Sequence, residues 1–146
     1  MRVHFTNLGC KLNQAEIERL ARDFAAAGHE VVGTLAEADL HVVNSCTVTS
    51  TAARSSRKAA GRGHGRGQDR LRTVLTGCWA TESPEKAARL AGVDLVVPNA
   101  EKEHLLARVH AAFPEAGSTV GPIPCSPSLE THTRALVKIE DGCNMR

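Results

Sequence analysis

Short apolar segments alternate with helix-like segments over the first 113 residues of the chain. The apolar segments have the length of β-strands and lie at 3–8, 29–33, 39–44, 71–76 and 93–97. The segment 39–44 has a continuous apolar middle, which is typical of a strand buried in a parallel sheet. Strands that alternate with helices form parallel sheets with right-handed crossovers and helices on both faces. We therefore expect an open, mostly parallel, five-stranded α/β sheet of the flavodoxin or Rossmann type.

Residues that favour helix ends place the helices between these strands. Asn13 and Glu16 have the spacing of a capping box, so we expect a helix that is capped by Asn13 and stops at Gly28. Ser83 and the proline after it are typical of another helix start. The remaining helices are expected at 49–58 and at 99–113, the latter capped by Asn99.

The composition changes after residue 113. A chain of 146 residues with 42% hydrophobic side chains can fill one core of ordinary size, and we expect that core within residues 1–113. Gly, Pro, Ser and Thr are frequent in residues 114–133, which is typical of an extended linker. Residues 134–140 are strand-like again, and we expect residues 134–146 to start a second domain that continues beyond this sequence.

Five cysteines are an odd number for a disulfide framework. No apolar run has the length of a membrane span, and the first strand is not preceded by a basic and apolar leader. We therefore expect a cytoplasmic protein, and a monomer, in which the thiols stay reduced. Metal binding or catalysis is then the main question about these cysteines.

Cys10, Cys46 and Cys78 each come directly after a predicted strand. Because the carboxyl ends of parallel strands share one edge, where open α/β sheets bind ligands, we expect the three thiols to converge there. A single free cysteine is most often a small buried side chain, but three at equivalent positions favour a shared site. Three thiolates can hold zinc together with a histidine such as His64, or three irons of a cubane cluster with the fourth iron open. The spacing alone leaves both alternatives open.

The segments around these cysteines are Leu8–Asn13, Asn44–Thr49 and Thr76–Ala80. Together they resemble the amino-terminal domain of the radical-SAM methylthiotransferases, and the resemblance covers residues 3–113. A fourth segment, Lys138–Asn144, resembles the start of that family's central domain, where the first cysteine of a C-x-x-x-C-x-x-C run binds the SAM-reducing cluster. Four such segments in the matching order make the resemblance specific.

The resemblance implies that Cys10, Cys46 and Cys78 bind an auxiliary 4Fe-4S cluster with one open iron. It also implies that Cys143 is the first ligand of a second 4Fe-4S cluster, which reduces S-adenosyl-L-methionine. The segment Gly9–Asn13 looks most like the branch that adds a methylthio group to carbon 2 of the adenine of threonylcarbamoyladenosine, beside the tRNA anticodon. The branch that acts on isopentenyladenosine of tRNA is the alternative. The implied partner is a tRNA anticodon stem-loop, and this fragment alone is expected to be inactive.

Seven basic residues and one acidic residue lie between residues 54 and 72, although the net charge of the chain is only +2. Such a cluster can neutralise RNA phosphates, and the candidate RNA contacts are Arg54, Arg57, Lys58, Arg62 and Arg66. A solvated surface is the alternative. Aromatic side chains make up only 3% of the chain, so rows of stacked bases are not expected. A zinc-stabilised α/β RNA-binding module without catalysis stays open as a function of another class.

Overall fold

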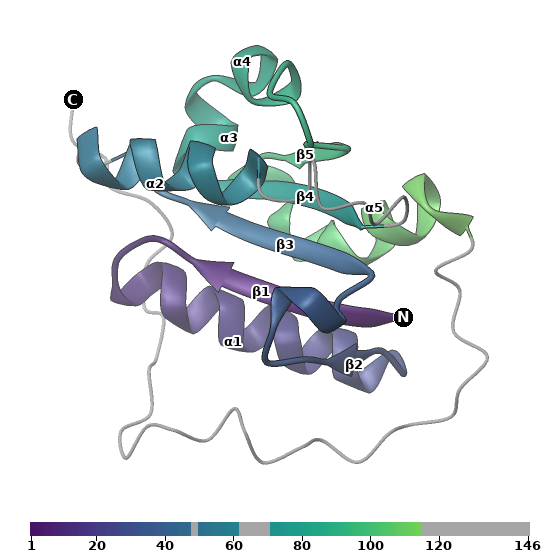
Figure 1. Cartoon of the computed structure of the whole chain (residues 1–146). Coiled ribbons are helices and arrows are strands. Elements are labelled where there is room, and N and C mark those ends of the chain that lie inside the picture. Colours follow the sequence, from purple (N-terminus) through teal and green to yellow (C-terminus); the bar gives the residue numbers. More distant parts are fainter. Residues whose placement is uncertain (48–49, 62–70, 115–146) are drawn as a thin grey trace.

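The computed structural model describes residues 1–47, 50–61 and 71–114, which form a sheet with helices. The five strands are all parallel and lie in the order β2-β1-β3-β4-β5 (Figure 1). Their bounds are Arg2–Asn7 (β1), Glu30–Val31 (β2), Leu40–Ser45 (β3), Arg72–Gly77 (β4) and Leu95–Val97 (β5). This is the flavodoxin-like order of a doubly wound fold. The expected five-stranded parallel α/β sheet is therefore confirmed.

Helices cover both faces of the sheet, and each face has its own apolar core. The helices are α1 (Lys11–Ala26), α2 (Ser50–Ala60), α3 (Cys78–Glu82), α4 (Pro84–Ala88) and α5 (Leu105–Ala112), with 3-10 turns η1 (Leu35–Glu37) and η3 (Asn99–His104). The core on one face joins side chains of α1 and α5 to the sheet, for example Phe24 and Leu105. The core on the other face joins α2, α3 and α4, for example Ala60 and Trp79. Figure 1 shows α2, α3 and α4 on the opposite side of the sheet from α1.

The central strand β3 contributes side chains to the apolar cores on both faces of the sheet. All six of its residues are buried. Leu40 and Val42 belong to the core under α1 and α5, whereas Val43 belongs to the core under α2 and α3. Successive side chains of a strand point to opposite faces, so this continuous apolar run supplies both cores at once.

The predicted start of α1 is wrong. The helix begins at Lys11 and its N-cap is Cys10, which makes no side-chain capping bond. Asn13 and Glu16 do not form a capping box, because both side chains are buried and bind residues of other elements. The predicted stop is confirmed, since Gly28 follows the helix with a φ of 84°.

The other predicted helices were found with different bounds. The segment expected to be one helix over 99–113 is the turn η3 followed by α5, and Pro98 rather than Asn99 stands at the N-cap of η3. Pro84 starts α4 after Ser83, as expected, but the short helix α3 before it was not predicted. The linker at 114–133 and the second domain at 134–146 lie almost wholly outside the described residues, so these domain bounds stay predictions. Among the described helices, none is both long and apolar enough to cross a membrane.

Candidate metal centre at the carboxyl edge of the sheet

The structure places Cys46 and Cys78 directly after β3 and β4, and Cys10 three residues after the end of β1. These three neighbouring strands run in parallel. The three cysteines therefore lie at one edge of the sheet, as the sequence predicted. The order of the strands reverses between β1 and β3, so the cysteines after those two strands stand on either side of the switch point. Open α/β sheets bind their ligands in the crevice at such a point.

The three thiols are free and differ in exposure. Cys10 is exposed, and its Sγ lies 3.6 Å from Oδ1 of Asn13. Cys46 is buried, and its backbone N–H donates a hydrogen bond of 3.2 Å to Oγ of Ser56 in α2. Cys78 is partly buried and is the first residue of α3. Cys10 is thus open to solvent. Cys46 lies against α2 and Cys78 begins α3, and both of these helices cover the face of the sheet opposite α1.

The thiols are close enough to influence one another's ionisation. Burial raises the pKa of the Cys78 thiol above its ordinary value, and Cys46 raises it further. The Lys102 ammonium acts in the opposite direction, and Cys10 adds a smaller increase. Thiolates gathered in this way repel one another, so a bound cation would favour their deprotonated forms.

The donor set fits an iron-sulfur cluster, because thiolate sulfur is the usual protein ligand of such clusters. Across residues 1–47, 50–61 and 71–114, however, no three His, Cys, Asp or Glu side chains are already grouped to hold a metal ion. The assignment of the three cysteines as ligands therefore stays a prediction. It is supported by the donor type, by the shared edge and by the effect of Cys46 and Cys10 on the pKa of Cys78.

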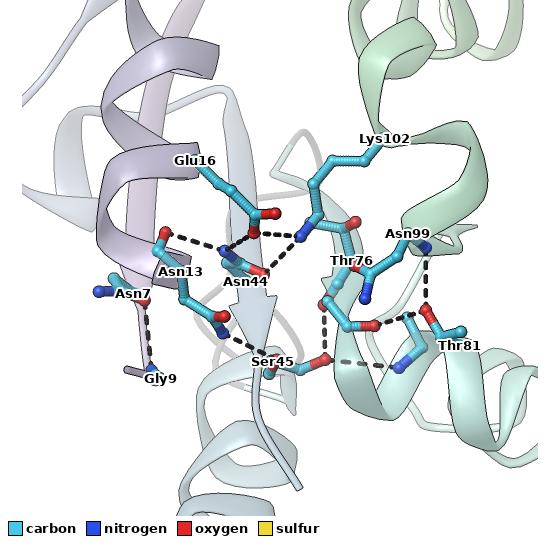
Figure 2. Close-up of polar contacts among 12 residues, drawn as sticks. Asn7, Gly9, Asn13, Glu16, Asn44, Ser45, Thr76, Thr81, Asn99 and Lys102 are labelled. Atoms are coloured by element: carbon cyan, nitrogen blue, oxygen red, sulfur yellow. Dashed lines mark hydrogen bonds and ion pairs between the residues drawn. The ribbon is translucent and has the colours of Figure 1, made fainter. Parts of the chain in front are cut away.

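A buried ion pair lies just inside this edge. Nζ of Lys102, in η3, is 2.6 Å from Oε2 of Glu16 in α1, and the two side chains are 5% and 6% exposed. The same ammonium donates a hydrogen bond of 3.3 Å to Oδ1 of Asn44 in β3. Figure 2 shows the three side chains pointing toward one another from three different elements. The pair therefore joins α1 and η3 to the central strand.

Hydrogen bonds extend from this pair to the turns that carry the cysteines (Figure 2). Nδ2 of Asn44 donates to the carbonyl oxygen of Asn13 at 3.1 Å, and Nδ2 of Asn13 donates to the carbonyl oxygen of Ser45 at 3.3 Å. Oγ of Ser45 donates to the carbonyl oxygen of Thr76 and accepts from the backbone N–H of Ala80 at 3.4 Å. The turns after β1, β3 and β4 are thus connected by one buried polar network.

Sequence reasoning missed Lys102 and the role of its partners. A signal was present in α1, where Asn13 and Glu16 occupy the same buried face as Ile17 and Leu20. Polar side chains on the apolar face of a helix need partners, because an unpaired buried charge is costly. That pattern indicates a buried polar contact, although it does not identify the partner.

A glycine before Cys78 allows the turns to approach closely. Gly77 has φ 95° and ψ −163°, a region of backbone space that is essentially restricted to glycine. A Cβ atom at this position would overlap the carbonyl oxygen of Ser45 and Oδ1 of Asn44. The turn that carries Cys78 can therefore pack against β3 only with glycine at position 77.

Two histidines of the strands are engaged in hydrogen bonds. His4 binds the carbonyl oxygen of Val32, and His41 binds Oγ1 of Thr6. Among the candidate RNA contacts, Arg54, Arg57 and Lys58 are exposed on α2. The other two candidate RNA contacts, Arg62 and Arg66, lie outside the described residues, as do His64, Cys143 and Cys125, a cysteine of the predicted linker.

The family model described as "Uncharacterized protein family UPF0004" matches residues 2–98, which include all three cysteines of the sheet edge. The chain belongs to the UPF0004 family. This family forms the amino-terminal part of the methylthiotransferases, so the resemblance found in the sequence is confirmed.

Curated relatives of this UPF0004 chain carry two names. It is 35% identical to the threonylcarbamoyladenosine tRNA methylthiotransferase MtaB of Aquifex aeolicus and 34% identical to that of Bacillus subtilis. These alignments cover 99% and 97% of the chain, but 37% and 34% of the relatives. It is also 32% identical to the ribosomal protein uS12 methylthiotransferase RimO of Alkalilimnicola ehrlichii, over 98% of the chain and 32% of that relative. The chain thus spans about a third of the length of these proteins.

Proposed function

We propose that this chain is the cluster-binding part of a methylthiotransferase that acts on threonylcarbamoyladenosine in tRNA. The observation that carries the proposal is the placement of Cys10, Cys46 and Cys78 after three adjacent parallel strands. The name shared by the relatives from Aquifex aeolicus and Bacillus subtilis supports the tRNA substrate.

The residues of this chain have separate roles in the proposal. Cys10, Cys46 and Cys78 hold an auxiliary 4Fe-4S cluster, and Cys143 is a ligand of a second 4Fe-4S cluster that binds S-adenosyl-L-methionine. When bound, the second cluster would supply the electron that converts S-adenosyl-L-methionine into a hydrogen-abstracting radical, and the auxiliary cluster would supply the sulfur, chemistry that side chains alone cannot perform. The buried network around Lys102 keeps the cysteine-bearing turns at fixed distances from one another.

The basic residues of α2 bind and orient the tRNA. Arg54, Arg57 and Lys58 project from one exposed side of a helix that begins only a few residues after Cys46. Phosphate contacts of this kind fix the position of an RNA without reading its sequence. The choice of the modified base must then depend on contacts nearer to the cysteines.

Nucleoside analysis tests the activity. The complete open reading frame that encodes this chain is expressed in cells that lack their own threonylcarbamoyladenosine methylthiotransferase, and the tRNA nucleosides are analysed by mass spectrometry. We expect the 2-methylthio derivative to appear, and to be lost when Cys10, Cys46 or Cys78 is replaced by Ala. Cys125→Ala is the matched control and should leave the product unchanged. Unmodified threonylcarbamoyladenosine with the unaltered protein would contradict the proposal.

Metal analysis separates the enzyme from the zinc-binding alternative. After anaerobic reconstitution with iron and sulfide, the chain should be brown and contain about four irons, as a single cubane cluster requires. Replacement of Cys46 by Ala should lower the iron and sulfide contents together. A colourless chain that binds one zinc ion instead would favour the RNA-binding module without catalysis.

A second substrate has support of its own. The relative from Alkalilimnicola ehrlichii is named for ribosomal protein uS12, and its identity to the chain is 32% against 35% for the relative from Aquifex aeolicus. Cells that also lack their own uS12 methylthiotransferase therefore provide a second measurement, the mass of uS12 peptides. A methylthio group on uS12 without modified tRNA would assign the protein substrate instead.

A further inference from the structure

A groove opens beside the cysteine edge, between α2 on one side and α3 with α4 on the other. Its volume is about 480 Å³, within the range of small-ligand sites. Thr47 and Trp79 line it, and these residues directly follow Cys46 and Cys78 in the sequence. A ligand in this groove would therefore lie next to the proposed metal centre.

Two cations border the groove. Arg57 and Lys86 both line it and are both exposed, and in the described part of the chain neither forms an ion pair with an acidic side chain. The guanidinium of Arg57 lies 5.9 Å from the ring centroid of Trp79. Stacking on an aromatic face holds the planar guanidinium in place and leaves its N–H groups free to bind phosphate oxygens.

Several of the other lining residues carry groups that can form hydrogen bonds with a nucleoside. Glu82 offers carboxylate acceptors, and Ser83 and Thr47 offer hydroxyl groups. Trp79 is itself only 7% exposed, so it supports Arg57 rather than offering a free face to a base. Recognition in this groove would thus depend on phosphate contacts and hydrogen bonds rather than on stacking.

We propose that this groove binds one unpaired nucleotide of an RNA loop. Its phosphate lies against Arg57 and Lys86, and its ribose hydroxyl or base edge lies against Glu82, Ser83 and Thr47. The inference rests on the proposed function, because the groove would hold a nucleotide beside the base that is modified.

An RNA chain fits the charge distribution better than a free nucleotide does. Arg54, one helical turn before Arg57, and Lys58, the residue after it, are exposed on the same helix and do not line the groove. Positive charge therefore continues along α2 beyond the volume that a single nucleotide can fill. Successive phosphates of an RNA strand can use this extension, whereas a mononucleotide leaves it unpaired.

Trp79 provides a local reporter for the test, because it is the only tryptophan of the chain and the chain has no tyrosine. The full chain is titrated with a fluorescently labelled anticodon stem-loop RNA, while RNA anisotropy and tryptophan emission are recorded in parallel. We expect the emission to change saturably with the same midpoint as the anisotropy.

Charge reversal then tests the contacts. Arg57→Glu and Lys86→Glu should each weaken RNA binding about tenfold at low salt, and each should reduce the slope of log affinity against log salt by about 1. Arg22→Glu is the matched control, because Arg22 is exposed on α1 at the other face of the sheet. All three positions are exposed, so the variants should fold normally, which circular dichroism checks.

Each contrary outcome has a distinct meaning. RNA binding that leaves the emission of Trp79 unchanged, with Arg57→Glu and Lys86→Glu equal to the control, would overturn the groove as the binding site. Saturation by AMP at the same concentration as the RNA would reassign the groove to free nucleotides. Absence of RNA binding would also overturn the inference, whereas the methylthiotransferase proposal is judged separately by the masses of the tRNA nucleosides.

Discussion

Replacing Lys102 by Met removes the ammonium from the buried pair and keeps an unbranched side chain of similar length. The Glu16 carboxylate, 6% exposed, then stays in the interior without its cation. Oδ1 of Asn44 also loses the hydrogen bond that it accepts from Lys102. The variant therefore leaves a buried carboxylate without its paired ammonium in the layer just inside the cysteine edge, although Nδ2 of Asn44 still donates to it at 3.4 Å.

The expected cost follows from the burial of both partners. Removing one partner of a buried ion pair typically destabilises a protein by about 3–5 kcal/mol, whereas a surface pair contributes about 0–1 kcal/mol. Domains have unfolding free energies of about 5–15 kcal/mol, so Lys102→Met should remove a large part of the total. The double variant Lys102→Met with Glu16→Gln should recover most of the loss, because it removes both charges and keeps an amide near Asn44.

Urea unfolding measures these differences, with far-UV circular dichroism and the emission of Trp79 as two probes of one transition. The matched control is Arg19→Met, which breaks a surface ion pair with Glu103 at 3.5 Å whose side chains are 42% and 69% exposed. A loss of less than about 1 kcal/mol for Lys102→Met, equal to the control, would refute the reasoning. So would a double variant that is less stable than the single variant, because the two substitutions must couple if the charges meet.

Three further predictions concern the turn before Cys78, a histidine at the opposite end of the sheet, and the metal. Gly77→Ala should destabilise the chain by about 1–3 kcal/mol in urea unfolding, because its φ of 95° is strained for alanine, whereas Gly33→Ala, with open space around it, should have little effect. Burial, the N-terminal ammonium and His110 lower the pKa of His29 to about 4, so the unfolding free energy should fall as the pH drops from 6.5 toward 4, by up to about 1.4 kcal/mol per pH unit. His29→Gln should flatten that slope and the exposed His104→Gln should not; an unchanged slope in His29→Gln would contradict the assignment. Chelation of bound metal should leave the circular dichroism spectrum and the cooperative unfolding intact, and a random-coil spectrum would show that metal binding drives folding.

The strands could be predicted from the sequence because a strand that is buried on both faces consists of a continuous run of apolar residues. The run around Val42 and Val43 is apolar since those side chains enter different cores, and each expected strand was found close to its predicted position. The shared position of the three cysteines followed from the same pattern, because parallel strands that end in cysteine must present them at one edge. Gly28 also marked the end of α1 reliably, since its positive φ is a local requirement.

The polar network could not be predicted because its contacts join residues that are remote in the sequence. Asn13 and Glu16 have the local spacing of a capping box, yet Glu16 binds Lys102 in η3, and Asn13 binds the carbonyl oxygen of Ser45. The tertiary contacts of Asn13 and Glu16 therefore replaced the capping box that their spacing favours. The same competition explains Asn99, whose predicted capping role is replaced by a 3-10 turn that places Lys102 under the sheet edge.

The two apolar cores and the buried ion pair contribute to the protein in different ways. The cores stabilise the sheet, and the ion pair helps to position the turns that carry the cysteines. One apolar core lies under α1 and α5, and the other lies under α2 and α3, so both faces of the sheet are packed. Among the described residues, neither core includes a cysteine. A buried ion pair is an inefficient source of stability, because the desolvation of both charges offsets most of their attraction. Hydrogen bonds, however, are directional, and those that extend from Lys102 through Asn44 and Asn13 determine how the cysteine-bearing turns face one another. It follows that the cores hold the sheet together, whereas the network at the carboxyl edge sets how the three cysteine-bearing turns are arranged.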